Sequence, residues 1–217
     1  TEKILKPDSV FIQSFVPFAR EVIEIASGYS VIQTVIKLTA PGIPDIYQGC
    51  ELWDLSYVDP DNRRPVDYKK RSSYLQQLRE AYDIGFNNVA TILSREDAAG
   101  IRKLFASWRL LNFRKDHPEL FTEGTYLPLT QLGEGNRAIG YARYHEGQWC
   151  LVVAPLLLAR KKSSDDIELK GNFLFLPPDS PQVWRNVFTD KLVEVSENGL
   201  SIDDLLSDFP VAVMYSI

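Results

Sequence analysis

Residues 48–68 concentrate side chains that could do chemistry. Several carboxylates lie there together with two adjacent arginines, Arg63 and Arg64, and two aromatic residues, Trp53 and Tyr57. The apolar residues of this stretch follow neither a helix nor a strand period, so the sequence predicts a loop. Binding and catalytic groups are often carried by such loops. The alternative is a solvated surface loop held by local salt bridges, which contribute little to stability.

A short strand is predicted immediately before this loop, over residues 42–47. Pro41 and Pro44 restrict the backbone and Gly42 tolerates conformations closed to other residues, so the beginning of the strand should be irregular. A buried strand that ends in a polar loop would hold the side chains of that loop at the end of a sheet.

The sequence LTAPGIPDIYQGCELWDLSYVDPDNRRPVDYKKR resembles the region around the last barrel strand of maltooligosyl trehalose synthases, members of the α-amylase superfamily. In that superfamily a P-G-x-P-x-x-Y-x-G-x-E pattern marks the eighth strand of a (β/α)8 barrel. The pattern is carried here by Pro41, Gly42, Pro44, Tyr47, Gly49 and Glu51. The continuation D-P-D-N-R-R-P-V-D-Y is narrower than the superfamily pattern and indicates the synthase. A second, weaker match covers residues 111–129.

The resemblance implies an α+β chain with two parts. Residues 1–121 would be the C-terminal part of a (β/α)8 catalytic barrel, containing its last strand and helices. Residues 122–217 would be a C-terminal antiparallel β-sandwich domain. Because the sequence begins at Thr1 without Met, we expect a fragment of a longer enzyme.

Periodicity predicts the individual elements. An apolar stripe indicates a helix that ends near Gly28; it consists of Phe11, Phe15, Phe18, Val22 and Ile25. Aromatic residues at helical spacing are usually part of a core, so we assign residues 11–18 and Trp108 to packing. Residues 137–144 and 148–155 should form a β-hairpin, with Gly147 providing the positive φ of its turn.

The active site of a (β/α)8 barrel lies at the C-terminal ends of its strands. The resemblance therefore implies that the loop contributes to a sugar subsite, in which aromatic rings stack beneath a sugar and an arginine pairs with an aspartate to close one end. Equally, such pairs could only hold the loop in place. The candidate substrate-binding residues are Trp53, Tyr57, Asp59, Asp61, Arg63 and Arg64.

The implied reaction converts the reducing-end α-1,4 linkage of a maltooligosaccharide into an α,α-1,1 linkage by intramolecular transglycosylation. Retaining glycosidic chemistry requires two carboxyl groups ~5–5.5 Å apart. In the superfamily these come from earlier barrel strands, which no segment here resembles, so we predict no catalytic residue and an inactive fragment. The alternatives are another α-amylase-type glucanotransferase or hydrolase, and a non-catalytic carbohydrate-binding module.

Composition excludes several classes of protein. A net charge of −5 without a basic stripe argues against nucleic acid as a partner. No apolar run approaches the ~20 residues of a membrane span. Cys50 and Cys150 belong to no metal-binding pattern, and two isolated thiols are typical of a reducing compartment, so we expect a cytoplasmic protein without a metal site. The resemblance implies that no organic cofactor is used. Apolar surface left by an incomplete barrel should favour self-association.

Overall fold

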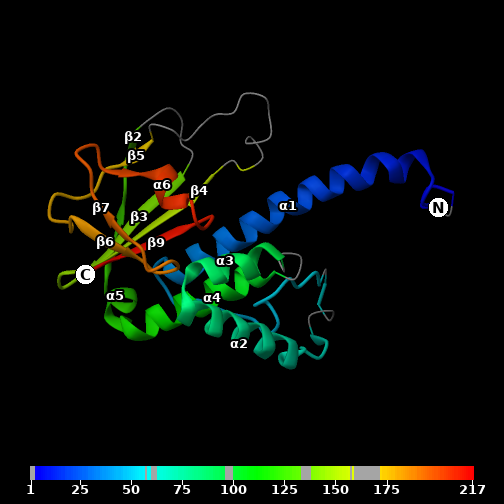
Figure 1. Ribbon diagram of the computed structural model, residues 1–217, viewed down its shortest axis with the longest axis horizontal. Helices are drawn as coiled ribbons and strands as arrows, with labels where there is room; N and C mark the ends of the chain where they lie inside the picture. Colours follow the sequence, from blue (N-terminus) through cyan, green and yellow to red (C-terminus); the bar gives the residue numbers. More distant parts are fainter. Residues whose placement is uncertain are drawn as a thin grey trace.

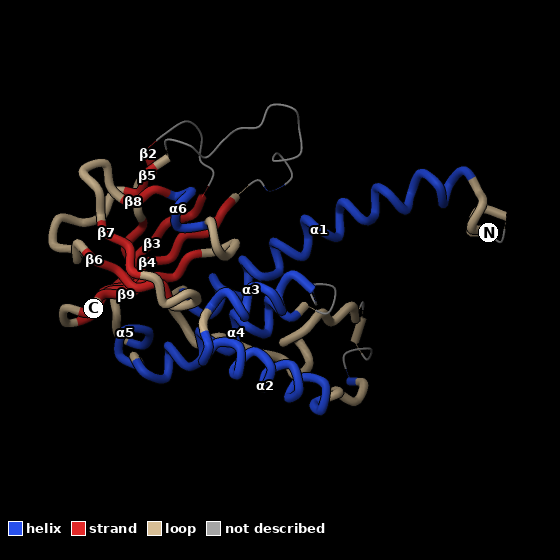
Figure 2. Tube along the Cα trace, in the orientation of Figure 1, coloured by secondary structure: helices blue, strands red, loops and turns tan. Residues whose placement is uncertain are grey.

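The computed structural model describes residues 3–56, 58–59, 63–95, 100–132, 138–156, 158 and 172–217, and every structural statement below concerns these residues. The first part of the chain forms helices and the second part forms antiparallel strands (Figures 1 and 2). The structure is therefore a mixture of helices and antiparallel sheet, as the sequence predicted.

The described helices are α1 (Val10–Thr39), α2 (Tyr68–Ile84), α3 (Phe86–Arg95), α4 (Ile101–Asp116), α5 (Pro118–Thr122) and α6 (Ile202–Leu206). Side-chain caps begin α1, α2 and α6; at α6 the hydroxyl of Ser201 accepts a hydrogen bond from the N–H of Asp204 at 3.3 Å. The hydroxyl of Ser9 accepts a hydrogen bond from the N–H of Ile12 at 3.2 Å at the start of α1. The carboxylate of Asp67 accepts one from the N–H of Lys70 at 2.9 Å at the start of α2. None of the described helices is long and apolar enough to cross a membrane.

The described strands are β1 (Thr125–Pro128), β2 (Gln131–Leu132), β3 (Ala138–His145), β4 (Gln148–Pro155), β5 (Phe173–Leu174), β6 (Val183–Asn186), β7 (Leu192–Glu194), β8 (Leu200–Ser201) and β9 (Ala212–Ser216). Six form an antiparallel sheet in the order β1-β3-β4-β9-β6-β7, and three form a smaller sheet in the order β2-β5-β8. The predicted hairpin is confirmed as β3 and β4. Its two turn residues, Glu146 and Gly147, both have positive φ, the geometry of a type I′ turn.

Strand β4 is buried on both faces and separates two apolar cores. Cys150 and Val152 belong to the core shared with the helices, and Leu151 and Val153 belong to the core shared with the small sheet and α6. Successive side chains of a strand point to opposite faces, which explains this alternation. The larger sheet is thus covered by helices on one face and by the short elements on the other.

Arg143 of β3 connects the sheet to the helices, and its charged side chain is almost fully buried between them. Its guanidinium donates to the carbonyl oxygens of Thr39 at 3.2 Å, Phe121 at 3.2 Å and Gly124 at 2.7 Å. Thr39 is the last residue of α1, where backbone carbonyls lack helical partners and the helix dipole favours a cation. Burial lowers the pKa of Arg143. The hydrogen bonds to these carbonyl oxygens replace those that the guanidinium would form with water.

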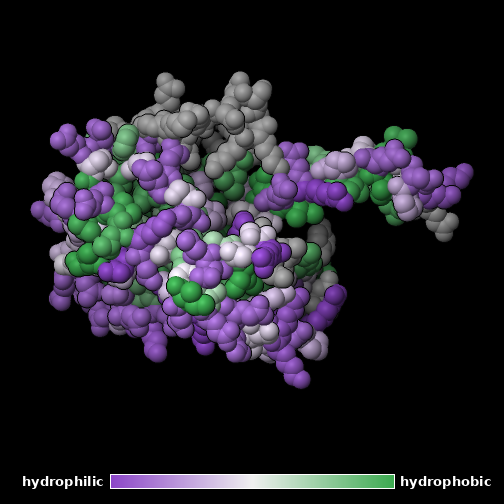
Figure 3. All heavy atoms as spheres, viewed as in Figure 1, coloured by the Kyte–Doolittle hydropathy of each residue, from purple (hydrophilic) through white to green (hydrophobic). Residues whose placement is uncertain are grey.

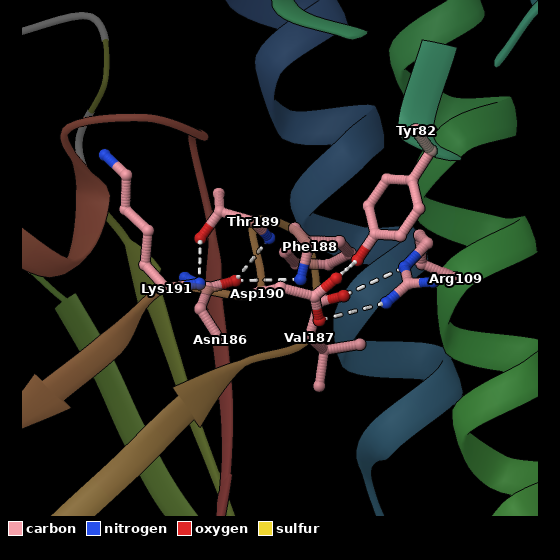
Figure 4. Close-up of polar contacts among 8 residues, drawn as sticks. All are labelled: Tyr82, Arg109, Asn186, Val187, Phe188, Thr189, Asp190 and Lys191. Carbon is pink, nitrogen blue, oxygen red and sulfur yellow. Dashed lines mark hydrogen bonds and ion pairs between the residues drawn. The ribbon is translucent and has the colours of Figure 1, made fainter. Parts of the chain in front are cut away.

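A second connection joins the turn between β6 and β7 to the helices (Figure 4). The phenol of Tyr82 on α2 donates to the carboxylate of Asp190. Arg109 on α4 donates to the carbonyl of Val187 at 2.9 Å, lies 3.7 Å from the Asp190 carboxylate and stacks over the Tyr82 ring. Asn186 shapes the turn, because its side-chain oxygen accepts from the N–H groups that follow it.

The predicted strand over residues 42–47 is wrong. Residues 43–47 are neither strand nor helix, and no described strand pairs with them. A strand is stable only when its backbone groups bond to a neighbouring strand, and local sequence cannot supply that neighbour. Ile43 is 96% exposed, whereas Ile46 packs against the helical core.

The first helix also differs from its prediction in two ways. Gly28 does not end it; α1 continues to Thr39, and a Cβ at Gly28 would lie 2.8 Å from the Leu158 side chain. Leu158 donates its N–H to the Tyr29 hydroxyl at 3.0 Å, so this glycine allows a close approach of the chain. Phe11, Phe15 and Phe18 are exposed and do not join the core, contrary to our assignment. Trp108 does pack against the helical core as expected.

Candidate functional site

A partly open pocket of about 300 Å³ lies within the loop that the sequence singled out. Its described lining comes from the two ends of the loop and from the start of α2. The lining residues are Gln48, Gly49, Trp53, Asp54, Leu55, Ser56, Arg64, Pro65, Val66, Asp67 and Arg71. Polar groups and one large aromatic ring are therefore brought together in one concave surface.

Arg71 holds the two sides of the pocket together. Its Nε donates to the carboxylate of Glu51 at 3.0 Å and its Nη2 donates to the carbonyl of Gly49 at 2.6 Å. Its Nη1 donates to the carbonyl of Asp67 at 3.2 Å. Gly49 has a φ of +89°, and a Cβ there would lie 3.2 Å from Val66. The turn after residue 47 thus depends on a glycine and on a half-buried ion pair, so Glu51 has a structural role here.

Trp53 is seated on α4. Its indole packs against Gly100, where a Cβ would lie only 2.7 Å from the backbone nitrogen of Trp53 and 2.9 Å from its ring. Gly100 also has a φ of +79°, so this position favours glycine for two reasons. The ammonium of Lys103 lies 5.8 Å from the centre of the Trp53 ring, and burial lowers the pKa of Lys103.

The carboxylates around the pocket are engaged in local structure. Asp54 accepts hydrogen bonds from the Ser56 hydroxyl at 2.5 Å and from the Ser56 N–H at 3.0 Å, and these bonds lower its pKa. Asp67 caps α2, and Glu51 pairs with Arg71. Asp54 thus stays ionised. It is suited to accept a hydrogen bond from a hydroxyl group rather than to act as a general acid.

The sequence-predicted binding residues separate into three groups. Trp53 and Arg64 line the pocket. Asp59 and Arg63 form a two-bonded ion pair, with distances of 3.0 and 2.5 Å, but their side chains are 54% and 67% exposed and are not among the described lining residues. Tyr57 and Asp61 lie outside the described residues. The sequence thus predicted that an aspartate pairs with an arginine in this loop. The structure places the pair of Asp59 and Arg63 on the exposed surface, and neither residue is among the described lining residues.

Sequence reasoning missed several lining residues. Gln48 and Ser56 lie close to Trp53 in the sequence, and nothing in their spacing distinguishes them from other loop residues. Arg71 is the last residue of the matched sequence, and nothing local connects its side chain to the loop. Asp67 precedes the first residue of a helix, which is an N-cap signal that could have been used. Among the described residues, no group of three or more His, Cys, Asp or Glu side chains could hold a metal ion.

Comparison with curated proteins identifies a relationship. Two proteins of Mycobacterium tuberculosis, from strains CDC 1551 and H37Rv and each provisionally named maltooligosyl trehalose synthase, are 43% identical to this chain over 108 residues. The chain is similar to maltooligosyl trehalose synthase. The match covers 50% of this chain and 11% of either relative, so the matched segment is a small part of a longer protein. The resemblance predicted from the sequence is confirmed.

A solved structure supports the same relationship at the level of the fold. The crystal structure of a maltooligosyl trehalose synthase aligns with 95% of this chain at a TM-score of 0.65 and 24% sequence identity. The alignment covers 24% of the solved chain. No family model matches the chain.

Proposed function

We propose that this chain forms the C-terminal part of a maltooligosyl trehalose synthase-type enzyme. Residues 1–121 would belong to a (β/α)8 barrel and residues 122–217 to a C-terminal β-sandwich domain. The observation that carries the proposal is the 43% identity over half of the chain to proteins of that name. The alignment of 95% of the chain with the solved synthase supports the corresponding fold.

The whole enzyme would convert the terminal α-1,4 linkage at the reducing end of a maltooligosaccharide into an α,α-1,1 linkage by intramolecular transglycosylation. This chain would not contribute the nucleophile or the acid–base group. The carboxylates of the pocket support this assignment, since each is engaged in holding a loop, a cap or an ion pair. Isolated from the rest of the enzyme, the chain would be inactive. We also assign the enzyme to the cytoplasm, as its two free thiols favour a reducing compartment.

The pocket would bind one part of the glucan. The indole of Trp53 would stack beneath a glucose ring, while Asp54, Gln48 and Arg64 would bond its hydroxyls. Partial burial of Trp53 against Gly100 supports this role, because a pre-positioned ring loses little conformational entropy on binding. The exposed pair of Asp59 and Arg63 would keep the loop in shape at the rim.

Titration of the purified chain with maltopentaose tests this proposal. We expect no turnover, and binding that quenches tryptophan fluorescence and is weakened at least tenfold by Trp53→Ala or Arg64→Ala. Arg63→Ala is the matched control, since its guanidinium faces solvent, and should change affinity less than twofold. Trehalose-type product from the chain alone, or equal affinities for all three variants, would contradict the proposal.

A non-catalytic carbohydrate-binding module is the second candidate, because the pocket combines an indole ring with several polar side chains, as a sugar-binding site requires. A module would bind internal glucan segments as well as chain ends. A cyclic glucan such as β-cyclodextrin has no reducing end, so tight binding of it in competition with maltopentaose would favour the module.

A further inference from the structure

Lys103 carries its charge in a position that disfavours a cation. Hydrophilic residues cover much of the face shown in Figure 3, where water solvates them (purple), but the side chain of Lys103 is partly buried. It lies in the first turn of α4, which begins at Ile101, and the helix dipole opposes a positive charge there. Burial lowers the pKa of Lys103, and repulsion by Lys37 of α1 lowers it further. A lysine in such a position needs compensating contacts.

The loop that forms the pocket supplies these contacts. The ammonium of Lys103 lies 5.8 Å from the centre of the Trp53 ring, within the range of a cation–π interaction. Electrostatic attraction to the Cys50 sulfur and to the carboxylates of Asp54 and Glu51 also favours the charged form. Among the described residues, no carboxylate forms an ion pair with this ammonium. The aromatic ring is therefore its closest described support on the loop.

Two residues at the start of α4 support the Trp53 ring in different ways. Gly100 lets the ring lie close to the helix, since a Cβ there would be 2.9 Å from it. Contact with a glycine has little directional preference, so it does not fix the tilt of the ring. An ammonium attracts the face of an aromatic ring and therefore does have such a preference. The tilt matters because Trp53 and Asp54 line the same pocket.

We propose that Lys103 is a positioning residue for the candidate sugar pocket, and that its ammonium holds the Trp53 indole in the orientation on which a glucose ring stacks. This inference rests on the proposed function. Lys103 is not among the described lining residues, so it acts through Trp53 rather than by touching the sugar. Only the charged form attracts the ring, so the pocket should lose affinity when Lys103 loses its proton.

Fluorine NMR tests the positioning without any sugar. The chain is labelled with fluorotryptophan, and the Trp53 signal is recognised by its absence from Trp53→Ala. We expect this signal to shift between pH 7 and pH 10, because the pKa of Lys103 is lowered from 10.5, and to lose that shift in Lys103→Met. All proteins carry Cys50→Ser, which removes the neighbouring thiol as a source of the shift. Lys37 remains in every variant, so its titration cannot explain the difference.

The affinity for maltopentaose tests the consequence for binding. At pH 7, Lys103→Met should bind about fivefold more weakly than the parent chain, as expected for the loss of one cation–π contact. Lys103→Arg should stay within twofold of the parent. At pH 10 the parent should approach the affinity of Lys103→Met, whereas Lys103→Arg should keep its affinity, because a guanidinium remains charged. Circular dichroism at each pH verifies that the proteins are folded.

Arg79→Met is the matched control for the loss of a cation. The Arg79 guanidinium also lies 5.8 Å from a tryptophan ring, but that ring belongs to Trp108, which is not among the described lining residues. This variant should change the affinity less than twofold. A double variant tests the route through the ring: in Trp53→Ala, adding Lys103→Met should also change the affinity less than twofold, since no indole is left to orient. NMR titration measures these weaker affinities.

Three results would overturn the role of Lys103. They are a Trp53 signal that titrates equally in Lys103→Met, an unchanged affinity of that variant, and an equal effect of Lys103→Met with and without the indole. Failure of the proposed function looks different, because the parent chain would then not bind maltopentaose at pH 7. The fluorine signal would still show whether Lys103 orients Trp53.

Discussion

The hydroxyl of Thr39 and the phenol of Tyr141 share a buried hydrogen bond of 2.5 Å. It joins the last residue of α1 to the middle of β3, beside the carbonyl of Thr39 that Arg143 binds. The helical part and the sheet therefore meet through directed polar contacts as well as through an apolar core. Such contacts specify how the two parts are oriented, because each requires its donor and acceptor in one geometry.

The polar contacts at Thr39 should contribute unequally to stability. Arg143→Met leaves several buried carbonyl oxygens without a donor and should lower the free energy of unfolding by about 3 kcal/mol. Tyr141→Phe should lower it by only about 1 kcal/mol, since the Thr39 hydroxyl still donates to the carbonyl of Val35. Urea denaturation followed by circular dichroism measures both values. Equal losses for the two variants would contradict this ranking.

The connection around Asp190 should be weaker but measurable. Tyr82→Phe removes the hydrogen bond to Asp190 and should cost about 1 kcal/mol in the free energy of unfolding. Arg63→Ala removes an exposed ion pair and should cost less than about 0.5 kcal/mol. A loss for Arg63→Ala that matches the loss for Tyr82→Phe would show that the exposed loop pair is more important than its solvent exposure indicates.

Stability should fall at alkaline pH. Burial raises the pKa of the Cys150 thiol from 9.0 to about 12, and burial also raises the pKa values of Tyr82 and Tyr141. Because the unfolded chain releases these protons first, the stabilisation is fully present below pH 9 and is lost as the pH rises above it. Cys150 alone should reduce the free energy of unfolding by up to about 1.4 kcal/mol per pH unit.

Cys150→Ala tests the alkaline effect. We expect a flatter pH dependence between pH 9 and 11 in the variant than in the parent chain, in equilibrium unfolding curves collected at constant ionic strength. Parallel curves for the two proteins would exclude the thiol as the source. The tyrosines would still produce a decline at higher pH, because their unfolded pKa is near 10.

Gly100 should be essential for the position of the Trp53 ring. Gly100→Ala places a Cβ against that ring at a positive φ, and we expect a loss of about 2–3 kcal/mol with a shift in tryptophan emission. Gly147→Ala is the matched control, since Gly147 has nearly the same φ but open space around it. It should cost about 1 kcal/mol without an emission shift. Identical results for both would mean that backbone strain alone explains the loss.

Local periodicity sufficed for the hairpin of β3 and β4 and for the amphipathic character of α1. Both depend on residues close in the sequence: alternation of apolar side chains with a turn glycine in the first case, and a 3.6-residue repeat in the second. The same repeat could not say whether the apolar face of α1 is covered. Coverage depends on what packs against Phe11 and Phe18, which lies beyond any local signal.

The sequence by itself determined the kind of loop and the kind of side chain that the candidate site contains, because residue type and spacing are local properties. Only the tertiary structure decided that Trp53 and Arg64 face one pocket while Asp59 and Arg63 pair at the surface. Only it could show that residues 43–47 have no described strand beside them. Strand pairing and pocket formation require groups distant in the sequence to meet, and that meeting is set by the packing of the whole chain.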